Sequence, residues 1–300
     1  MEQFIVQFGS GKPGEMGTGD TERQVLKRIG IENPVIGFAP FHHIMHGMPN
    51  DWSLFQELVQ PLTSQELRLF EFHKEKDMKL LRDKILECDL FVLGSGVCEP
   101  YLDYFFTNKV DEIFKEFFSL GKSFLGYSAG SICLNTNYIH VVFFRELFIH
   151  WNMMQQASKE EREEFKKEVL HECPKEHKNN LKNVLESKEN PDLFNHHMME
   201  ETFQVTNRKA LGFIPKIALL PHFDEAIHAT SAHLQAAANR FPNHKHFGVP
   251  NGASLFHTFE KGRLVRTEVV GRNNNPKLQV TQFLKKDRVT YKPGEKIDLG

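Results

Sequence analysis

A serine flanked by small residues stands out at Ser128. It lies in the tract SFLGYSAGSICL, residues 123–134, where the residues from Gly126 to Gly130 fit the pattern G-x-S-x-G. In that pattern a strand turns sharply into a helix, and the strained central serine projects its hydroxyl above the sheet. Small neighbours are needed because the two backbone segments crowd each other. The apolar residues before and after the turn favour a nucleophilic serine over an ordinary turn.

A nucleophilic serine needs a base, and the chain has 16 histidines. Most are expected to be structural or at the surface, and none has companions at a spacing typical of a metal site. We therefore expect no metal and no cofactor. His222 differs because Pro221-His222-Phe223 directly ends the apolar run Ile217–Leu220. We place His222 on the same sheet edge as Ser128 and predict that it is the base; a strand-end histidine bonded only to backbone is the alternative.

The elements that would position these residues are short apolar runs alternating with helical patterns. Runs without alternation suit strands covered on both faces, and they are Phe4–Phe8, Pro34–Ala39, Asp89–Leu93, Ser123–Tyr127 and Ile217–Leu220. Apolar residues recur at helical spacing in residues 77–88 and 110–120. This predicts an α/β fold, a mostly parallel sheet with helices on both faces. Gly-rich turns would lie at the carboxyl ends of the strands, where such sheets bind ligands.

Two further regions complete the expected organisation. Residues 160–190 are charge-dense and poor in apolar residues, which predicts an exposed helical insertion; we set its limits at 141–209. From Phe247 onward the sequence is β-like, and Lys261-Gly262 predicts a hairpin turn in a small C-terminal β-hairpin region. We expect residues 1–300 to form a single α/β hydrolase-like domain containing the insertion.

Composition excludes several other classes of protein. The chain has 37 basic and 39 acidic side chains, which indicates neither nucleic acid nor an anionic membrane as a partner. Its longest apolar stretch, residues 139–151, is interrupted by Arg145 and Glu146, so it is too short and too charged to span a bilayer. The four cysteines form no CxxC pair, and the first residues resemble no signal peptide. We expect a cytoplasmic protein.

The block GYSAGS with the downstream LGFIPKIALLPHFDE resembles the dipeptidase E family of serine peptidases, which includes the cyanophycinases. That family has a fold related to class I glutamine amidotransferases, with serine in place of cysteine. The blocks at 92–96, 126–130 and 211–223 match in order, and a weaker one lies at 248–252. The resemblance covers roughly residues 1 to 270.

The resemblance implies roles for particular residues. Ser128 would be the nucleophile and His222 the general base. An oxyanion hole would be formed by backbone N–H groups of Gly94, Ser95, Gly96 and Ala129.

The sequence also departs from the family pattern. Asn251 stands where relatives have an acid in the fourth block, and residues 134–144 lack the Asp that other relatives have after the nucleophile. The family's Gly-Gly-Gly-Asn turn is Gly-Ser-Gly-Val at 94–97. We expect Asn251 to face His222, with Glu225 as second choice; Asp224 and Glu146 are the other carboxylates considered. No arginine follows soon after residue 223, so aspartyl specificity is not expected.

Two functions from different classes remain open at this point. The first is a serine peptidase or amidase of small peptides or amides. The second is a catalytically impaired relative with a binding or regulatory role, which the missing acid favours. A glutamine amidotransferase is disfavoured because serine occupies the nucleophile position and Cys133 would be buried and inert. A homodimer is compatible with the sequence.

Overall fold

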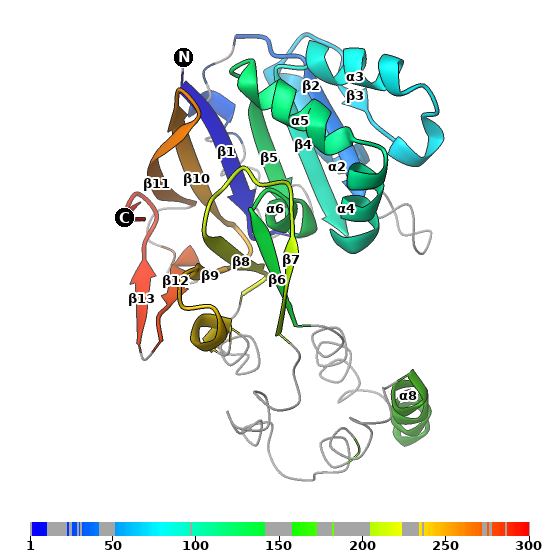
Figure 1. Ribbon diagram of the computed structural model, residues 1–300, viewed down its shortest axis with the longest axis vertical. Coiled ribbons are helices and arrows are strands. Elements are labelled where there is room, and N and C mark those ends of the chain that lie inside the picture. Colours follow the sequence, from blue (N-terminus) through cyan, green and yellow to red (C-terminus); the bar gives the residue numbers. More distant parts are fainter. Residues whose placement is uncertain are drawn as a thin grey trace.

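The computed structural model describes most of the chain outside the predicted insertion (Figure 1). The described residues are 2–10, 23, 26–28, 30, 32–41, 52–96, 98–141, 158–172, 182, 205–223, 234–235, 237–271, 275, 278–285 and 287–299.

The main sheet has eight strands in the order β14-β11-β10-β1-β5-β4-β2-β3. The five strands from β3 to β1 run parallel, whereas β10, β11 and β14 add to β1 as antiparallel strands. The mostly parallel sheet is therefore confirmed, and the C-terminal hairpin extends it. The strands are β1 Glu2–Phe8, β2 Ile36–Phe41, β3 Arg68–Leu69, β4 Leu90–Gly96, β5 Ser123–Tyr127, β10 Ala253–Glu260, β11 Arg263–Gly271 and β14 Lys296–Ile297.

Helices cover both faces of this sheet. The helical elements are α2 Trp52–Val59, η3 Gln60–Leu62, η4 Phe72–Lys74, α3 Met78–Glu87, α4 Cys98–Thr107, α5 Val110–Ser119, α6 Ala129–Cys133 and α8 Lys159–Glu172. Side chains of β4 alternate between two separate cores, as the period of a strand requires. Phe91 points into a core shared with Phe114 of α5, and Val92 into one shared with Phe55 of α2. Figure 1 shows α3 and α5 lying over the parallel strands.

A second sheet corrects the predicted position of His222. Its four strands, in the order β13-β12-β9-β8, are separate from the main sheet; they are β8 Ile217–Pro221, β9 Lys245–Val249, β12 Val280–Phe283 and β13 Arg288–Tyr291. The strand before His222 is β8, which pairs in parallel with β9. The prediction that this strand shares a sheet edge with Ser128 was wrong, because an apolar run predicts a buried strand but not its pairing partner.

A two-stranded ribbon stands at the limits of the predicted insertion. Strands β6, Asn137–Val141, and β7, Val205–Lys209, are antiparallel, and the register pairs Val141 with Val205. The chain therefore leaves and rejoins this ribbon at adjacent positions. Of the residues between β6 and β7, the structure describes residue 158, the helix α8, which is rich in Glu and Lys, and residue 182. The other residues between the two strands lie outside the described residues.

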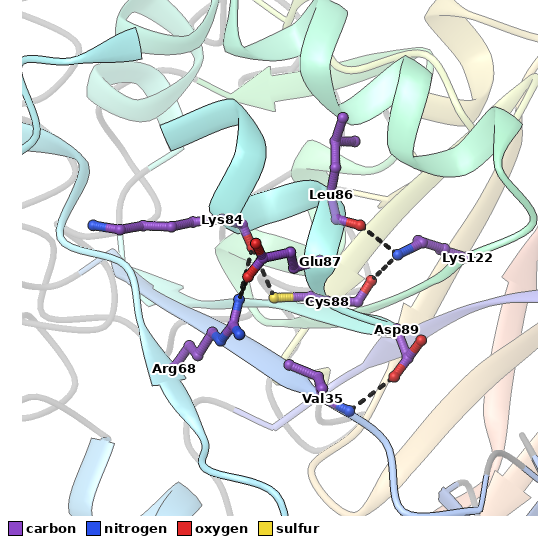
Figure 2. Close-up of polar contacts among 8 residues, drawn as sticks. All are labelled: Val35, Arg68, Lys84, Leu86, Glu87, Cys88, Asp89 and Lys122. Carbon is purple, nitrogen blue, oxygen red and sulfur yellow. Dashed lines mark hydrogen bonds and ion pairs between the residues drawn. The ribbon is translucent and has the colours of Figure 1, made fainter. Parts of the chain in front are cut away.

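Polar contacts join the segments that precede β2, β4 and β5, at the amino ends of these parallel strands (Figure 2). Ser128 follows the carboxyl end of β5. Lys122 donates from Nζ to the carbonyl oxygens of Leu86 and Cys88, where α3 ends and β4 is about to begin. Asp89 accepts through Oδ2 from the backbone N–H of Val35 at 2.9 Å. Burial raises the pKa of the Cys88 thiol to about 12, so this cysteine is a core residue without thiolate reactivity.

Candidate active site

Ser128 lies at the turn between β5 and α6. It occupies the N-cap position of the helix, with φ 46° and ψ −107°, and the residue is 8% exposed. A positive φ is uncommon for a residue with a Cβ and marks a strained turn. The prediction that Ser128 begins a helix after a buried strand is confirmed.

Glycines allow this turn to form because backbone approaches backbone on both sides. A Cβ at Gly126 would lie 2.6 Å from the carbonyl carbon of Gly130, across the turn. A Cβ at Gly130 would lie 2.2 Å from the carbonyl oxygen of Leu93 in β4. The same contact packs the first turn of α6 against the carboxyl end of β4. The two glycines of the sequence pattern are thus required by close contacts that the structure contains.

His222 follows β8 and also adopts a positive φ, 54°. Its backbone N–H donates to the carbonyl oxygen of Gly9 at 2.9 Å, which joins the end of the second sheet to the end of β1. The next residue, Phe223, packs so closely on Gly248 that a Cβ there would lie 2.4 Å from its ring. These contacts direct the imidazole toward Ser128, and Nε2 lies 2.9 Å from the Ser128 Oγ atom.

Asn251 contacts the other ring nitrogen of His222. Its Oδ1 atom lies 2.8 Å from Nδ1. An amide oxygen can only accept a hydrogen bond, so Nδ1 carries the proton in this arrangement. Nε2 is then unprotonated and accepts from the hydroxyl of Ser128. The second choice for this position, Glu225, lies outside the described residues, as do Asp224 and Glu146.

The carboxyl end of β4 lies beside the start of α6. Gly94 and Ser95 are within the buried part of β4, and Gly96 ends the strand with φ 138°. The close approach of Gly130 to Leu93 and Gly94 fixes the end of β4 next to Ala129, the first residue of the helix. Val97 lies outside the described residues. The four residues expected to form an oxyanion hole are therefore on adjoining segments.

A buried polar network behind α6 was not predicted from the sequence. Gln7 of β1 donates through Nε2 to the carbonyl oxygen of Ser131 at 2.6 Å and to Oδ1 of Asn135 at 3.0 Å. Its Oε1 atom lies 2.9 Å from Nε2 of the fully buried His257. Burial lowers the pKa of His257 to about 3, so the ring is neutral at pH 7. A single polar residue within an apolar run does not indicate in the sequence which other polar residue it contacts.

The described part of the chain offers neither a metal site nor a helix that could span a membrane. Those residues contain no group of three or more His, Cys, Asp or Glu side chains placed to hold a metal ion. Among the same residues, no helix is both long and apolar enough to cross a bilayer. The described cysteines, Cys88, Cys98 and Cys133, are buried and form no disulfide.

Comparisons with known proteins support the fold. No protein-family model matches the chain, and no curated protein matches it by sequence. Among solved structures, a peptidase from an acI-B1 Actinobacterium superposes with a TM-score of 0.62 at 14% identity, covering 100% of this chain and 98% of its own. A protein assigned as peptidase E from Listeria monocytogenes EGD-e gives a TM-score of 0.51 at 12% identity, covering 90% of this chain and 100% of its own. The chain has the fold of these peptidase structures.

Proposed function

We propose that the chain is a serine-type hydrolase of small peptides or amides, related to peptidase E. The observation that carries the proposal is the continuous contact from Ser128 through His222 to Asn251. A hydroxyl, an imidazole and a group that orients the imidazole are the parts required for nucleophilic attack on a carbonyl. The fold shared with two peptidase structures supports the same reaction class.

The proposed reaction begins with attack by the Oγ atom of Ser128 on the carbonyl carbon of the substrate. His222 takes the hydroxyl proton at Nε2 as the Oγ–C bond forms. The imidazolium then protonates the leaving amine as the C–N bond breaks, which leaves an acyl-serine. Water, deprotonated by the same nitrogen, releases the acid and restores Ser128. Atoms and protons balance over the cycle without any cofactor.

Charge on the substrate oxygen is stabilised by backbone N–H groups in this proposal. Ala129 presents its N–H in the first turn of α6, and the end of β4, formed by Gly94, Ser95 and Gly96, lies alongside. Donors fixed in a buried segment need no reorganisation when the oxyanion forms. We therefore assign binding of the oxyanion to the backbone N–H groups of these two segments.

Asn251 distinguishes this proposed enzyme from one with an acidic third residue. Its amide oxygen fixes the tautomer and orientation of His222, as an asparagine does in papain-like proteases. An amide carries no charge, so it stabilises the imidazolium less than a carboxylate would. We therefore expect slow turnover at neutral pH. The same observation favours the second candidate, a relative with weak catalysis whose main role is to bind a peptide or regulate a partner.

The test is hydrolysis of a mixture of dipeptides, tripeptides and amino-acid amides by the purified chain and by Ser128→Ala. Products are identified by liquid chromatography and mass spectrometry. The proposal predicts cleavage of a subset of substrates by the parent chain and none by the variant. Equal product formation by both proteins would exclude Ser128 as the nucleophile. Binding of peptides without cleavage would favour the second candidate.

A further inference from the structure

The end of β1 contacts the segments that carry Ser128 and His222. The carbonyl oxygen of Phe8 accepts from the backbone N–H of Ser128 at 3.3 Å. The next carbonyl, that of Gly9, accepts from the backbone N–H of His222 at 2.9 Å. Two consecutive residues, the last of β1 and the one that follows it, therefore hold the nucleophile of one segment and the base of another.

Ser10, the third residue in this run, contacts the turn that carries Asn251. The N–H of Gly252 donates to Oγ of Ser10 at 3.2 Å. Ala253 donates its N–H to the carbonyl oxygen of Pro250 at 3.1 Å, which closes a four-residue turn with Asn251 and Gly252 in its centre. Gly252 has φ 87°, the value that a type II turn requires at its third residue.

The hydroxyl of Ser10 selects one orientation of the central peptide in this turn. Types I and II differ by a flip of the peptide between the two central residues, here Asn251 and Gly252. Ser10 accepts from the N–H of that peptide, so a flip would break the hydrogen bond. Because Ser10 is fully buried, bulk water cannot readily replace the lost acceptor. The flip would also turn the backbone of Asn251 and shift its side chain relative to His222.

Gly9 brings Ser10 close enough to reach this turn. A Cβ at Gly9 would lie 2.3 Å from the carbonyl oxygens of both Val249 and Pro250. Only a glycine lets the end of β1 approach the end of β9 so closely. The N–H of Gly9 also donates to the carbonyl oxygen of Ala253 at 3.0 Å. The Gly9-Ser10 pair therefore fits against both sides of the turn.

We propose that Ser10 is a positioning residue that holds Asn251 against His222, with Gly9 providing the close approach that this requires. The proposal rests on the proposed function for its effect on catalysis. Its structural part, the control of the Asn251–His222 hydrogen bond, does not depend on hydrolysis. Ser10 itself is buried beneath the turn and acts through Asn251.

Ser123 offers a matched control for Ser10→Ala. It is 2% exposed, and its Oγ accepts from the backbone N–H of Phe4 at 3.1 Å. That hydrogen bond also ties β1 to a neighbouring segment, but at the amino end of β5, far along the strand from the site. Ser123→Ala therefore removes the same kind of buried bond without touching the turn of Asn251. A general loss of stability would affect both variants alike.

The experiment measures two properties of the full chain and of each variant. The first is the exchange rate of the His222 Nδ1 proton by NMR, with the resonance assigned from its loss in His222→Gln. The second is the rate at which a fluorophosphonate probe modifies Ser128. We expect Ser10→Ala to speed exchange of the Nδ1 proton and to slow modification about 10-fold or more, as misplacement of a catalytic group does. Ser123→Ala should match the parent in both.

The two readouts separate failure of this inference from failure of the proposed function. Unchanged exchange of the Nδ1 proton in Ser10→Ala would overturn the positioning role, whatever the probe shows. Equal effects of Ser10→Ala and Ser123→Ala would overturn it too, since they would reflect general stability. If the parent chain is never modified at Ser128 but the exchange rate responds to Ser10→Ala alone, the proposed function fails and the positioning role stands.

Discussion

Ser128 and His222 meet through side chains at 2.9 Å while both hold a positive backbone φ, 46° and 54°. They are 94 positions apart in the chain and follow strands of different sheets. Residues with a Cβ adopt such angles at a cost that the surrounding structure must offset. Backbone strain is therefore expected at both residues whose side chains would carry out the first proton transfer.

Replacing Ser128 by glycine should relieve this strain. Ser128→Gly and Ser128→Ala both lack the hydroxyl and should both be inactive, but only glycine accepts φ 46° without a steric penalty. We expect the free energy of unfolding of Ser128→Gly to exceed that of Ser128→Ala by about 1 kcal/mol, after the added flexibility of the unfolded chain is allowed for. Urea unfolding of the two variants measures the difference. A more stable alanine variant would argue against strain at this turn.

Replacing Asn251 by aspartate should speed hydrolysis. The two side chains have nearly the same shape, so a carboxylate oxygen can take the position 2.8 Å from the His222 Nδ1 atom. A negative charge there stabilises the imidazolium that forms during attack, and we expect kcat to rise roughly 10-fold or more. Asn251→Ala should lower kcat, because nothing then fixes the tautomer. Rapid turnover by the parent, lost in Asn251→Asp, would show that the acid lies elsewhere.

A methyl group at Gly130 should disrupt the turn. It would meet the backbone of Leu93 at 2.2 Å, and backbone cannot move aside as a flexible side chain can. We expect Gly130→Ala to lower the free energy of unfolding by about 3 kcal/mol or more. Gly121→Ala is the control: its φ is 87° but its Cβ would contact nothing within 4 Å, so only backbone strain of about 1–2 kcal/mol is expected. Thermal or urea unfolding measures both variants. Equal decreases in the free energy of unfolding for Gly130→Ala and Gly121→Ala would contradict the close packing of α6 on β4.

Buried His257 should make the fold sensitive to acid. Burial lowers its pKa from 6.5 to about 3. Between these values the unfolded chain binds a proton that the folded chain excludes, so the free energy of unfolding should fall as pH decreases. The expected slope is about 1.4 kcal/mol per pH unit from this group.

His257→Gln tests this dependence because glutamine does not titrate. Urea unfolding at pH 6 and at pH 4 measures the effect. The free energy of unfolding should fall less in the variant than in the parent over this range. His246 provides a comparison, since burial lowers its pKa to about 4. It should also make the free energy of unfolding fall as pH decreases, but over a narrower pH range. Parallel stability profiles of His257→Gln and the parent would contradict the assignment.

Local patterns predicted the turn at Ser128 because its geometry depends on neighbours in sequence. Gly126 and Gly130 are required by contacts within the turn and with the adjoining strand, and small residues at that spacing are visible in the sequence. The hairpin at Lys261-Gly262 is similar, since both residues have positive φ and the strands on either side pair directly. The sequence pattern of these features is local even where, as at Gly130, the contact that requires it is with another strand.

Contacts between distant segments could not be predicted in the same way. The apolar run before His222 predicts a strand, but its pairing with β9 depends on which segments pack together. The hydrogen bonds from the Gly252 N–H to Ser10 and from His257 to the amide oxygen of Gln7 join residues 242 and 250 positions apart. A lone serine or glutamine beside apolar residues has no pattern that identifies its partner. The position of Asn251 was predicted only through the family resemblance.

Modification of the purified chain by a fluorophosphonate probe, followed by peptide mapping, tests the central claim most directly. The probe forms a covalent bond only with a serine that a base has activated. The proposed function predicts a single phosphonylated peptide containing Ser128, with modification strongly slowed in His222→Gln and absent in Ser128→Ala. A chain that hydrolyses peptides while Ser128 stays unmodified, or a rate that is the same in the parent and in His222→Gln, would contradict it.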